Sequence, residues 1–394
     1  MRPLAITHYS IVNSLGLGQQ RVFEALHARK SGLQRCDFDT VDLDTYIGRV
    51  PALDETAIRG DLPRYDCRNN RLAQLALEAD GFADGVRTAR ERYGPDRVGV
   101  FMGTSTSGLL QAELAYRDRD AQTGALPDGF AYASTQNNFS LAAFVHAYLG
   151  LTGPAVTVSS ACSSSAKVFG NAARMVASGF CDAAIVGGVD TLCLTTLYGF
   201  ASLQLLSRQP CRPFDVHRDG ISIGEGAGFA LLEQPGARDD PLLLGIGESS
   251  DAHHMSTPHP EGYGAQLAMQ RALAAADLRP ADIDYINLHG TASKTNDAAE
   301  DKAVSQVFGR STPASSTKGS TGHLLGAAGI TEAIFGLLAI EHQMLPGGLH
   351  TQTLDPAMQS NYLLSNVETR ARRVLSNSFG FGGSNCSLVL GLRD

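Results

Sequence analysis

The chain has 394 residues, of which 43% are hydrophobic and 18% charged, and its formal net charge is −8. This length allows one large domain or two of ordinary size, with a sizeable buried core. The negative charge argues against nucleic acid or an anionic membrane as the main partner. Apolar runs all stay below ~18 residues, so we expect no membrane span. The seven cysteines lack metal-like pairing and the N-terminus lacks a secretory signal, which predicts a reducing cytoplasmic location.

The first part of the chain alternates apolar strands with helical patterns. Expected strands cover residues 4–12, 98–102, 155–158, 182–189 and 227–232. Expected helices cover residues 20–28, 69–83, 138–149 and a stretch from Cys162 to about Gly179. Segments 36–61, 117–129 and 207–225 are typical of loops. The strand–helix–strand order around Cys162 predicts parallel strands joined by a right-handed crossover.

The second part repeats this style. Expected strands cover residues 242–246, 283–288, 314–316, 373–377 and 387–390, and expected helices cover 266–276, 297–308 and 323–343. The Pro- and Asp-containing break at 235–240 divides the chain into two halves, 1–240 and 241–394. Each half has a strand that leads into a helix rich in small residues. We therefore expect two slim helices packed at the centre of a pseudo-duplicated α/β structure.

Cys162 lies where the short strand 155–158 turns into a helix. Unpaired N–H groups and the positive end of the helix dipole favour an anion there, so the thiol is expected to ionise easily and act as a nucleophile. The small neighbours in the stretch SSACSSSA leave room for a bulky electrophile. The alternative is that Cys162 is a buried structural cysteine, as most cysteines are.

Three further turns carry polar chemistry. His289 ends an apolar strand, Lys318 and His323 bracket the stretch GSTG, and residues 379–383 form a Gly-rich turn. Each could instead be structural, and two histidines with a cysteine could be a zinc site. However, 127 residues (289 − 162) separate Cys162 from His289, and no local ligand pair supports a metal. A cysteine with a histidine also fits a cysteine protease.

Five stretches together resemble the β-ketoacyl-[acyl-carrier-protein] synthases of the elongating type. They are VSSACSSSA, RPFDVHRDGISIGEGAG, NLHGTASKTNDAAE, STKGSTGHLLGAAG and SNSFGFGGSN, in the order of that family. The resemblance runs from Leu4 nearly to the C-terminus. It implies the thiolase fold, with five αβαβα layers, and usually a homodimer. A partner from a related subunit, giving a heterodimer, is the alternative.

The resemblance also implies roles for the residues of these stretches. Cys162 would accept the acyl chain from acyl carrier protein, and His289 and His323 would stabilise the enolate formed when malonyl loses CO₂. Lys318 and Glu300 would support the histidines, and the N–H groups of Cys162 and Phe381 would form the oxyanion hole. Phe381 would also act as a gate. The implied substrate contacts are Thr291, Ser293, Thr106, Phe200, Phe379 and Asp251. The reaction would require no cofactor.

Some positions stay open. Ser293 stands where many relatives have Thr and keeps the hydroxyl. Thr106 is intermediate between the small and branched residues that tune acyl pocket depth. A structural monovalent cation is a possibility at the positions Asn287, Glu332, Ser376 and Asn377. A patch for the carrier protein is a possibility at Arg64, Arg68, Arg117 and Arg119, although a solvated face is the alternative.

The sequence therefore predicts decarboxylative Claisen condensation of an acyl thioester with malonyl-acyl carrier protein, as in fatty acid elongation. One alternative is the same chemistry in a dedicated polyene or polyketide pathway, with a chain-length partner. Another is a non-catalytic partner subunit, but such subunits typically lack the cysteine. The sequence leaves acyl chain length, pathway and dimer partner open.

Overall fold

The computed structural model describes residues 1–236 and 239–393. In this part of the chain, twelve strands form one sheet through the molecule, in the order β14-β12-β11-β16-β17-β10-β1-β9-β7-β5-β6, with β2 paired to β1. The strands of the first half are β1 (Leu4–Asn13), β2 (Gly16–Leu17), β5 (Val98–Gly103), β6 (Ala155–Val158), β7 (Ala183–Asp190) and β9 (Gly226–Glu233). Those of the second half are β10 (Leu242–Ser250), β11 (Tyr285–Asn287), β12 (Pro313–Ser315), β14 (Asn361–Tyr362), β16 (Arg373–Gly380) and β17 (Ser384–Gly391).

Each half of the sheet mixes parallel and antiparallel pairs. In the first half, β5 pairs parallel with β6 and β7, whereas β9 runs antiparallel to β7 and β1. In the second half, β11 pairs parallel with β12 and β16, whereas β17 runs antiparallel to β16 and β10. The two halves of the sheet join where β1 meets β10, through two residue pairs, Leu4 with Leu243 and Ala5 with Leu242. Two small sheets lie outside, one of β3 (Leu33–Arg35), β4 (Tyr46–Gly48) and β8 (Ile223–Gly224), the other of β13 (Met344–Leu345) and β15 (Val367–Glu368).

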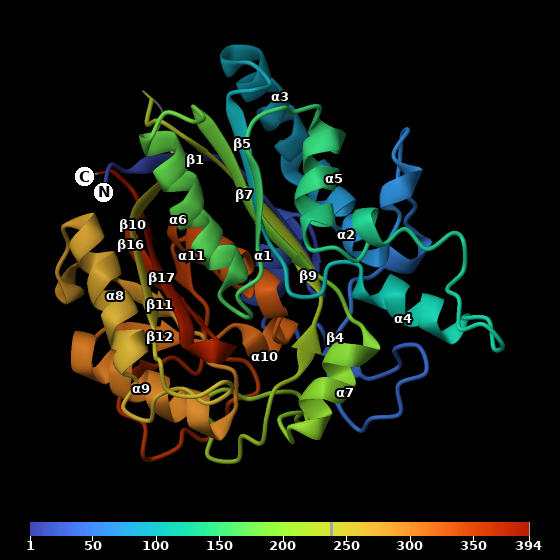
Figure 1. Cartoon of the computed structure of the whole chain (residues 1–394). Helices are drawn as coiled ribbons and strands as arrows, with labels where there is room; N and C mark the ends of the chain where they lie inside the picture. The colour runs from blue at the N-terminus through green and yellow to red at the C-terminus, as the bar shows by residue number, and fades with distance from the viewer. Residues whose placement is uncertain (237–238, 394) are drawn as a thin grey trace.

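Figure 1 shows the five expected αβαβα layers side by side. Helices α8 (Tyr263–Ala276) and α9 (Lys294–Phe308) cover one outer face, and α2 (Arg68–Glu78), α3 (Phe82–Tyr93) and α5 (Phe139–Leu149) cover the other. Between the two halves of the sheet lie α6 (Ser164–Ala177) and α11 (Ala328–His342). The remaining helices are α1 (Gln19–His27), α4 (Leu109–Arg117), α7 (Leu194–Ser202) and the short α10 (Lys318–Thr321). This is the thiolase fold expected from the sequence.

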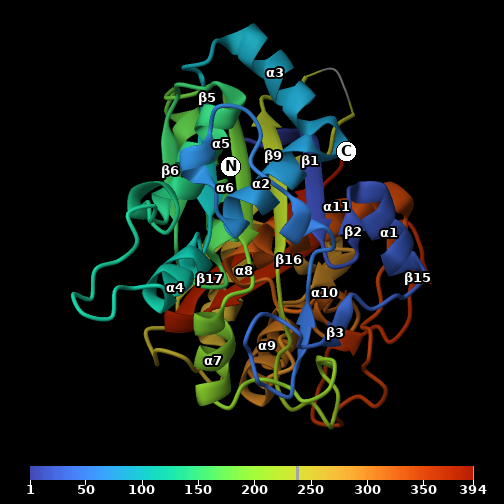
Figure 2. The same cartoon turned by 90° about the vertical axis from the view of Figure 1, so that its right-hand side faces the viewer.

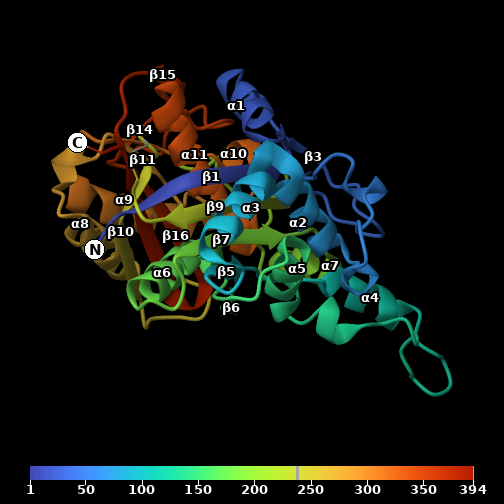
Figure 3. The ribbon, with the colours of Figure 1, turned by 90° about the horizontal axis from the view of Figure 1, so that it is seen from above.

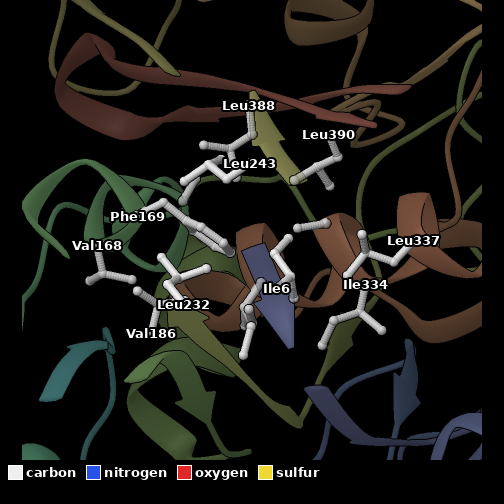
Figure 4. Packing of buried hydrophobic residues seen from close by; sticks show 14 of the residues in the cluster. Ile6, Val168, Phe169, Val186, Leu232, Leu243, Ile334, Leu337, Leu388 and Leu390 are labelled. Carbon is white, nitrogen blue, oxygen red and sulfur yellow. The ribbon is translucent and has the colours of Figure 1, made fainter. Parts of the chain in front are cut away.

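The central layer is held by apolar packing from both sides. Figure 4 shows side chains of α6 and α11 meeting those of strands from both halves of the sheet. The labelled residues are Ile6, Val168, Phe169, Val186, Leu232, Leu243, Ile334, Leu337, Leu388 and Leu390. All are at most 3% exposed, and full burial of such a side chain contributes about 1.5–3 kcal/mol.

The two central helices approach closely because their facing residues are small, as the sequence predicts. A Cβ atom on Gly329 would lie 2.5 Å from the backbone nitrogen of Ala166, so only glycine fits there. The Ile330 N–H donates to Ser165 Oγ at 3.0 Å and ties the start of α11 to α6. Helix α11 also belongs to a segment, Leu325–His342, that is long and apolar enough to cross a membrane, but 89% of this segment is buried inside the protein.

Several sequence predictions of local structure are wrong. The helix expected over 69–83 is two helices, because Asp80 and Gly81 adopt positive φ angles of 57° and 68° between α2 and α3. Helices α4 and α7 were not expected. The second slim helix begins at Ala328 rather than at His323. The break at 235–240 lies partly outside the described residues.

Candidate active site

Cys162 is held in a tight turn between β6 and α6. The preceding Ala161 has a φ of +53°, and Ser164 closes the turn: its hydroxyl accepts from Ser160 N–H at 2.9 Å and donates to Ala161 O at 2.6 Å. Helix α6 begins at Ser164, so Cys162 precedes the helix rather than standing in its first turn, as the sequence suggested. The side chain is buried, with 6% of its surface exposed.

Two histidines of the second half meet this sulfur. His323 Nε2 lies 3.1 Å from Cys162 Sγ, and the rings of His289 and His323 are 5.3 Å apart at 84°. One ligand-type atom from each of Cys162, His289 and His323 lies within 4.8 Å of the others. The fold therefore brings Cys162 beside two histidines that lie 127 (289 − 162) and 161 (323 − 162) positions later in the chain.

The partners of the histidine rings fix which nitrogen carries the proton. The Leu325 N–H donates to His323 Nδ1 at 3.1 Å, and Lys318 Nζ lies 3.3 Å from His289 Nδ1. Each Nδ1 is therefore an acceptor, which assigns the proton of the neutral ring to Nε2. Burial and, second, the positive charge of Lys318 lower the pKa of both histidines well below the usual value. Two neutral Nε2–H donors suit an oxygen acceptor, whereas a metal ion would need a lone pair at Nε2.

Lys318 and Glu300 act on His289 in different ways. Lys318 is 1% exposed, forms an ion pair with Glu332 and donates to His289 O at 2.5 Å. Glu300 accepts from the N–H groups of His289 at 2.8 Å and Gly290 at 2.7 Å, so it holds the backbone rather than the ring. Burial raises the pKa of Glu300 to about 7.

The electrostatics of Cys162 differ from the sequence expectation. Burial raises the pKa of the Cys162 thiol to about 11, although the charge of Lys318 and the N–H of Phe381 act to lower it. The expectation of an easily ionised thiol is therefore wrong, because a thiolate would lose its hydration at this buried position. The charges of Glu332 and Asp190 raise the pKa further.

A cavity leads from the surface to these three residues. Its lining includes Thr291, Ser293, Asp251, Phe200, Phe379 and Phe381, all predicted from the sequence. The rings of Phe381 and Phe200 are 5.7 Å apart beside Cys162. The lining residues that sequence reasoning missed are Leu205, Ile221, Ser256, Thr257, Pro258, Thr295, Asn296 and Asn385. A signal existed for Thr295 and Asn296, because they follow Ser293 in the same predicted turn.

Thr106 does not line this cavity. Its hydroxyl donates to Asp190 Oδ1 at 2.8 Å and accepts from the Thr191 N–H at 3.2 Å. The polar atom of Thr106 is thus engaged by the end of β7. The sequence prediction that Thr106 contacts the acyl chain finds no support in the cavity lining.

Three of the four positions of the possible cation carry buried polar atoms without a hydrogen-bond partner. Both polar atoms of the Asn287 side chain, Ser376 Oγ and Glu332 Oε2 are buried without a hydrogen-bond partner. Asn287 and Ser376 are register partners on the neighbouring strands β11 and β16. Asn377 differs, because it accepts from Ser387 Oγ and donates to Glu300. Oxygen donors of this kind suit a hard cation.

The four arginines proposed as a carrier-protein patch are not one free basic surface. Arg68 is buried and pairs with Glu225 and Asp54. Arg117 pairs with Asp39 at 2.6 Å. This part of the sequence reading is wrong for Arg68, whose charge is neutralised inside the protein.

Comparisons with known proteins agree over the whole chain. The family descriptions that match are "Beta-ketoacyl synthase, N-terminal domain" at residues 1–236 and "Beta-ketoacyl synthase, C-terminal domain" at residues 242–352. The 3-oxoacyl-[acyl-carrier-protein] synthase 2 of Rhizobium meliloti is 34% identical over 420 aligned positions, which cover 99% of each chain. The mitochondrial 3-oxoacyl-[acyl-carrier-protein] synthase of Arabidopsis thaliana is 40% identical over 61% of this chain and 57% of its own length.

Solved structures show the same likeness. A ketosynthase from Xenorhabdus doucetiae, in complex with its chain length factor, has a TM-score of 0.90 and 38% identity, and the match covers 100% of this chain and 98% of the other. The ishigamide ketosynthase/chain length factor has a TM-score of 0.90 and 28% identity, with full coverage of both chains.

Proposed function

The chain belongs to the β-ketoacyl synthase family, and we propose that its Cys162, His289 and His323 carry out the decarboxylative condensation of an acyl thioester with malonyl-acyl carrier protein. The product is a 3-oxoacyl-acyl carrier protein that is two carbons longer. The chain is an enzyme, an acyltransferase of the ketosynthase class. The proposed roles rest on one observation. Cys162 Sγ lies close to two histidines, and the Nδ1 atom of each histidine already has a hydrogen-bond donor.

The first step transfers the acyl chain. The Cys162 sulfur attacks the thioester carbonyl of acyl-acyl carrier protein, and the carrier thiol leaves with the proton of Cys162. The N–H groups of Cys162 and Phe381 stabilise the oxyanion that forms on the way. Phe381 has its N–H directed at the sulfur and its ring beside Phe200, so it can sense whether an acyl chain has entered.

The second step generates the carbon nucleophile. The Nε2–H groups of His289 and His323 donate to the thioester oxygen of malonyl-acyl carrier protein, and CO₂ leaves as the enolate forms. Lys318 keeps His289 in the donating tautomer through Nδ1. The enolate carbon then attacks the Cys162 thioester, the bond to sulfur breaks, and the departing Cys162 thiolate takes up a proton from solvent. Thr291 and Ser293, whose hydroxyls are 3.0 Å apart in the lining, position the pantetheine arm.

Half-reactions test these roles. His289→Ala should still be acylated by acyl-acyl carrier protein, but its release of CO₂ from malonyl-acyl carrier protein should fall by about 10²–10³-fold, as for loss of one oxyanion donor. The control is His350→Ala, because His350 lies outside the cavity lining. Unchanged CO₂ release in the His289 variant would refute the role of this ring.

Our second proposal is that the chain forms a heterodimer with a related subunit. It is supported by the likeness to ketosynthases solved with a chain length factor. Strand β6 ends the sheet and leaves one edge unpaired, and β6 and α4 lie on one side of the molecule (Figures 2 and 3). Exposed apolar side chains occur on α4 and on neighbouring segments, at Leu114, Tyr116, Tyr132, Phe139 and Tyr198. The mass of the purified chain in solution, alone and after coexpression with a chain length factor, distinguishes a homodimer from a heterodimer.

The remaining expectations are proposals of the same kind. The first half (1–240) supplies the nucleophile, and the second half (241–394) supplies the histidines and the lysine. Asn287, Glu332 and Ser376 would hold a structural monovalent cation, which would supply charge and rigidity beside the Lys318 ion pair. All seven cysteines are free thiols, which supports a cytoplasmic location.

A further inference from the structure

Asp190, the last residue of β7, is a fully buried carboxylate that no step of the proposed reaction uses. Three backbone N–H groups and two hydroxyls surround it. The donors are Thr104 Oγ1 at 2.7 Å, Ser105 N at 2.8 Å, Thr106 N at 2.8 Å, Thr106 Oγ1 at 2.8 Å and Gly326 N at 2.5 Å. Backbone N–H groups can only donate, so they stabilise the ionised carboxylate against the burial that raises the pKa of Asp190.

The donors come from two turns on either side of the catalytic sulfur. On one side, the segment after β5 is hydrogen-bonded to the turn that carries Cys162. Ser105 Oγ donates to the O atom of Ala161, the residue before Cys162, at 3.3 Å. On the other side, Gly326 follows His323 by three residues. Leu325, between them, has a φ of +52° and directs its N–H at His323 Nδ1.

The contact with Gly326 leaves no room for a side chain. A Cβ atom on Gly326 would lie 2.8 Å from Asp190 Oδ2 and 2.7 Å from Ser105 Oγ. The carboxylate, the Ser105 loop and the start of the α11 segment are thus packed at contact distance. A change in the charge or hydrogen bonding of the carboxylate therefore acts directly on both turns.

We propose that Asp190 is a positioning residue, which clamps the turn that carries Cys162 to the turn that carries His323 and so sets the geometry between the sulfur and the Nε2–H donor. The inference rests on the proposed function, since it concerns the same reaction. Asp190 touches neither substrate nor sulfur and acts through backbone groups. Its charge reaches Cys162 from the first half, whereas Lys318, Glu332, His289 and His323 face the sulfur from the second half.

The test uses Asp190→Asn, which keeps the shape but turns one acceptor into a donor that faces N–H groups. The matched control is Asp301→Asn. Asp301 is also buried, at 2% exposure, and accepts from the backbone of Gln359 and from Ser360, away from the cavity lining. Both variants lose buried hydrogen bonds, so a general effect on stability appears in both.

Only Asp190→Asn should change the chemistry. We expect its condensation kcat to fall by about tenfold or more, with KM for acyl-acyl carrier protein unchanged, because a hydrogen bond to a charged group is lost at the clamp. We also expect alkylation of Cys162 by iodoacetamide to begin at lower pH than in the wild type, because a negative charge near the thiol is removed. This alkylation requires no condensation, so it tests Asp190 even if the proposed reaction fails in the wild type.

Two results overturn the inference. One is an Asp190→Asn enzyme with the wild-type kcat and the wild-type alkylation profile. The other is an equal loss of kcat in Asp301→Asn. If Asp190→Asn does not fold, Thr104→Val removes one donor and keeps the carboxylate. It should lower kcat in the same direction by a smaller factor, and an unchanged kcat in that variant also overturns the inference.

Discussion

The Lys318→Met variant should leave Glu332 as an unpaired buried carboxylate. Both side chains are almost fully buried, at 1% and 4% exposure, and they form an ion pair. Removal of one partner of such a pair costs about 3–5 kcal/mol, because the remaining charge stays in a medium that cannot solvate it. Lys318 also donates to His289 O, so the loss belongs near the upper end of that range.

The stability of the Lys318→Met variant should depend on pH in a definite direction. Burial raises the pKa of Glu332 above its ordinary 4.5, and in the variant Lys318 no longer opposes this shift. The folded variant then holds a proton that the unfolded chain has already released. Its stability should therefore be retained below pH ~4.5 and fall by about 1.4 kcal/mol per pH unit as the pH rises toward the folded pKa.

The assay is urea unfolding at several pH values between 5 and 8. The matched control is the double variant Lys318→Met/Glu332→Gln, in which no buried charge remains. It should recover most of the stability and lose the pH slope, although it lacks the donor to His289 Nδ1. A Lys318→Met protein with wild-type stability at pH 8, or a double variant no more stable than the single one, would refute this account of the ion pair.

Two further predictions concern the sulfur and the central helices. Alkylation of wild-type Cys162 should be slow at pH 7 and still rise above pH 9, because burial raises its pKa to about 11; a plateau below pH 8 would contradict this. Gly329→Ala should destabilise the protein by about 1–3 kcal/mol in thermal or urea unfolding, since the new Cβ would meet the Ala166 nitrogen at 2.5 Å. Gly199→Ala on α7 meets nothing within 4 Å and should be neutral or stabilising, so equal losses in the two glycine variants would argue against close helix packing.

Strong periodic patterns carried most of the fold prediction. The apolar runs of β5 and β7 are strands buried along their length, as expected. The small residues around Gly329 correctly indicated closely packed helices. By contrast, the helix expected over 69–83 breaks at Asp80. The sequence did not reveal this break, because the apolar spacing continues across the change in backbone direction. The short helices α4 and α7 carry patterns too brief to separate from loops.

The proximity of the candidate residues could be predicted from the sequence, but their pKa values could not. The motifs identified Cys162, His289, His323 and Lys318, and the fold brings them together. The sign of the Cys162 pKa shift was missed, because burial outweighs the helix terminus and depends on the whole cavity. Asp190 was missed although it ends an apolar strand, the same signal that singled out His289. Arg68 was wrongly assigned to a surface patch, because its buried partner Glu225 is 157 residues away in the sequence.

Intact-protein mass after exposure to acyl-acyl carrier protein tests the central claim most directly, with Cys162→Ala beside Cys193→Ala as a control that removes a cysteine outside the cavity lining. The account predicts one acyl adduct on the wild type and on Cys193→Ala, and none on Cys162→Ala. An adduct that persists on Cys162→Ala would show that another residue accepts the acyl chain and would contradict the account.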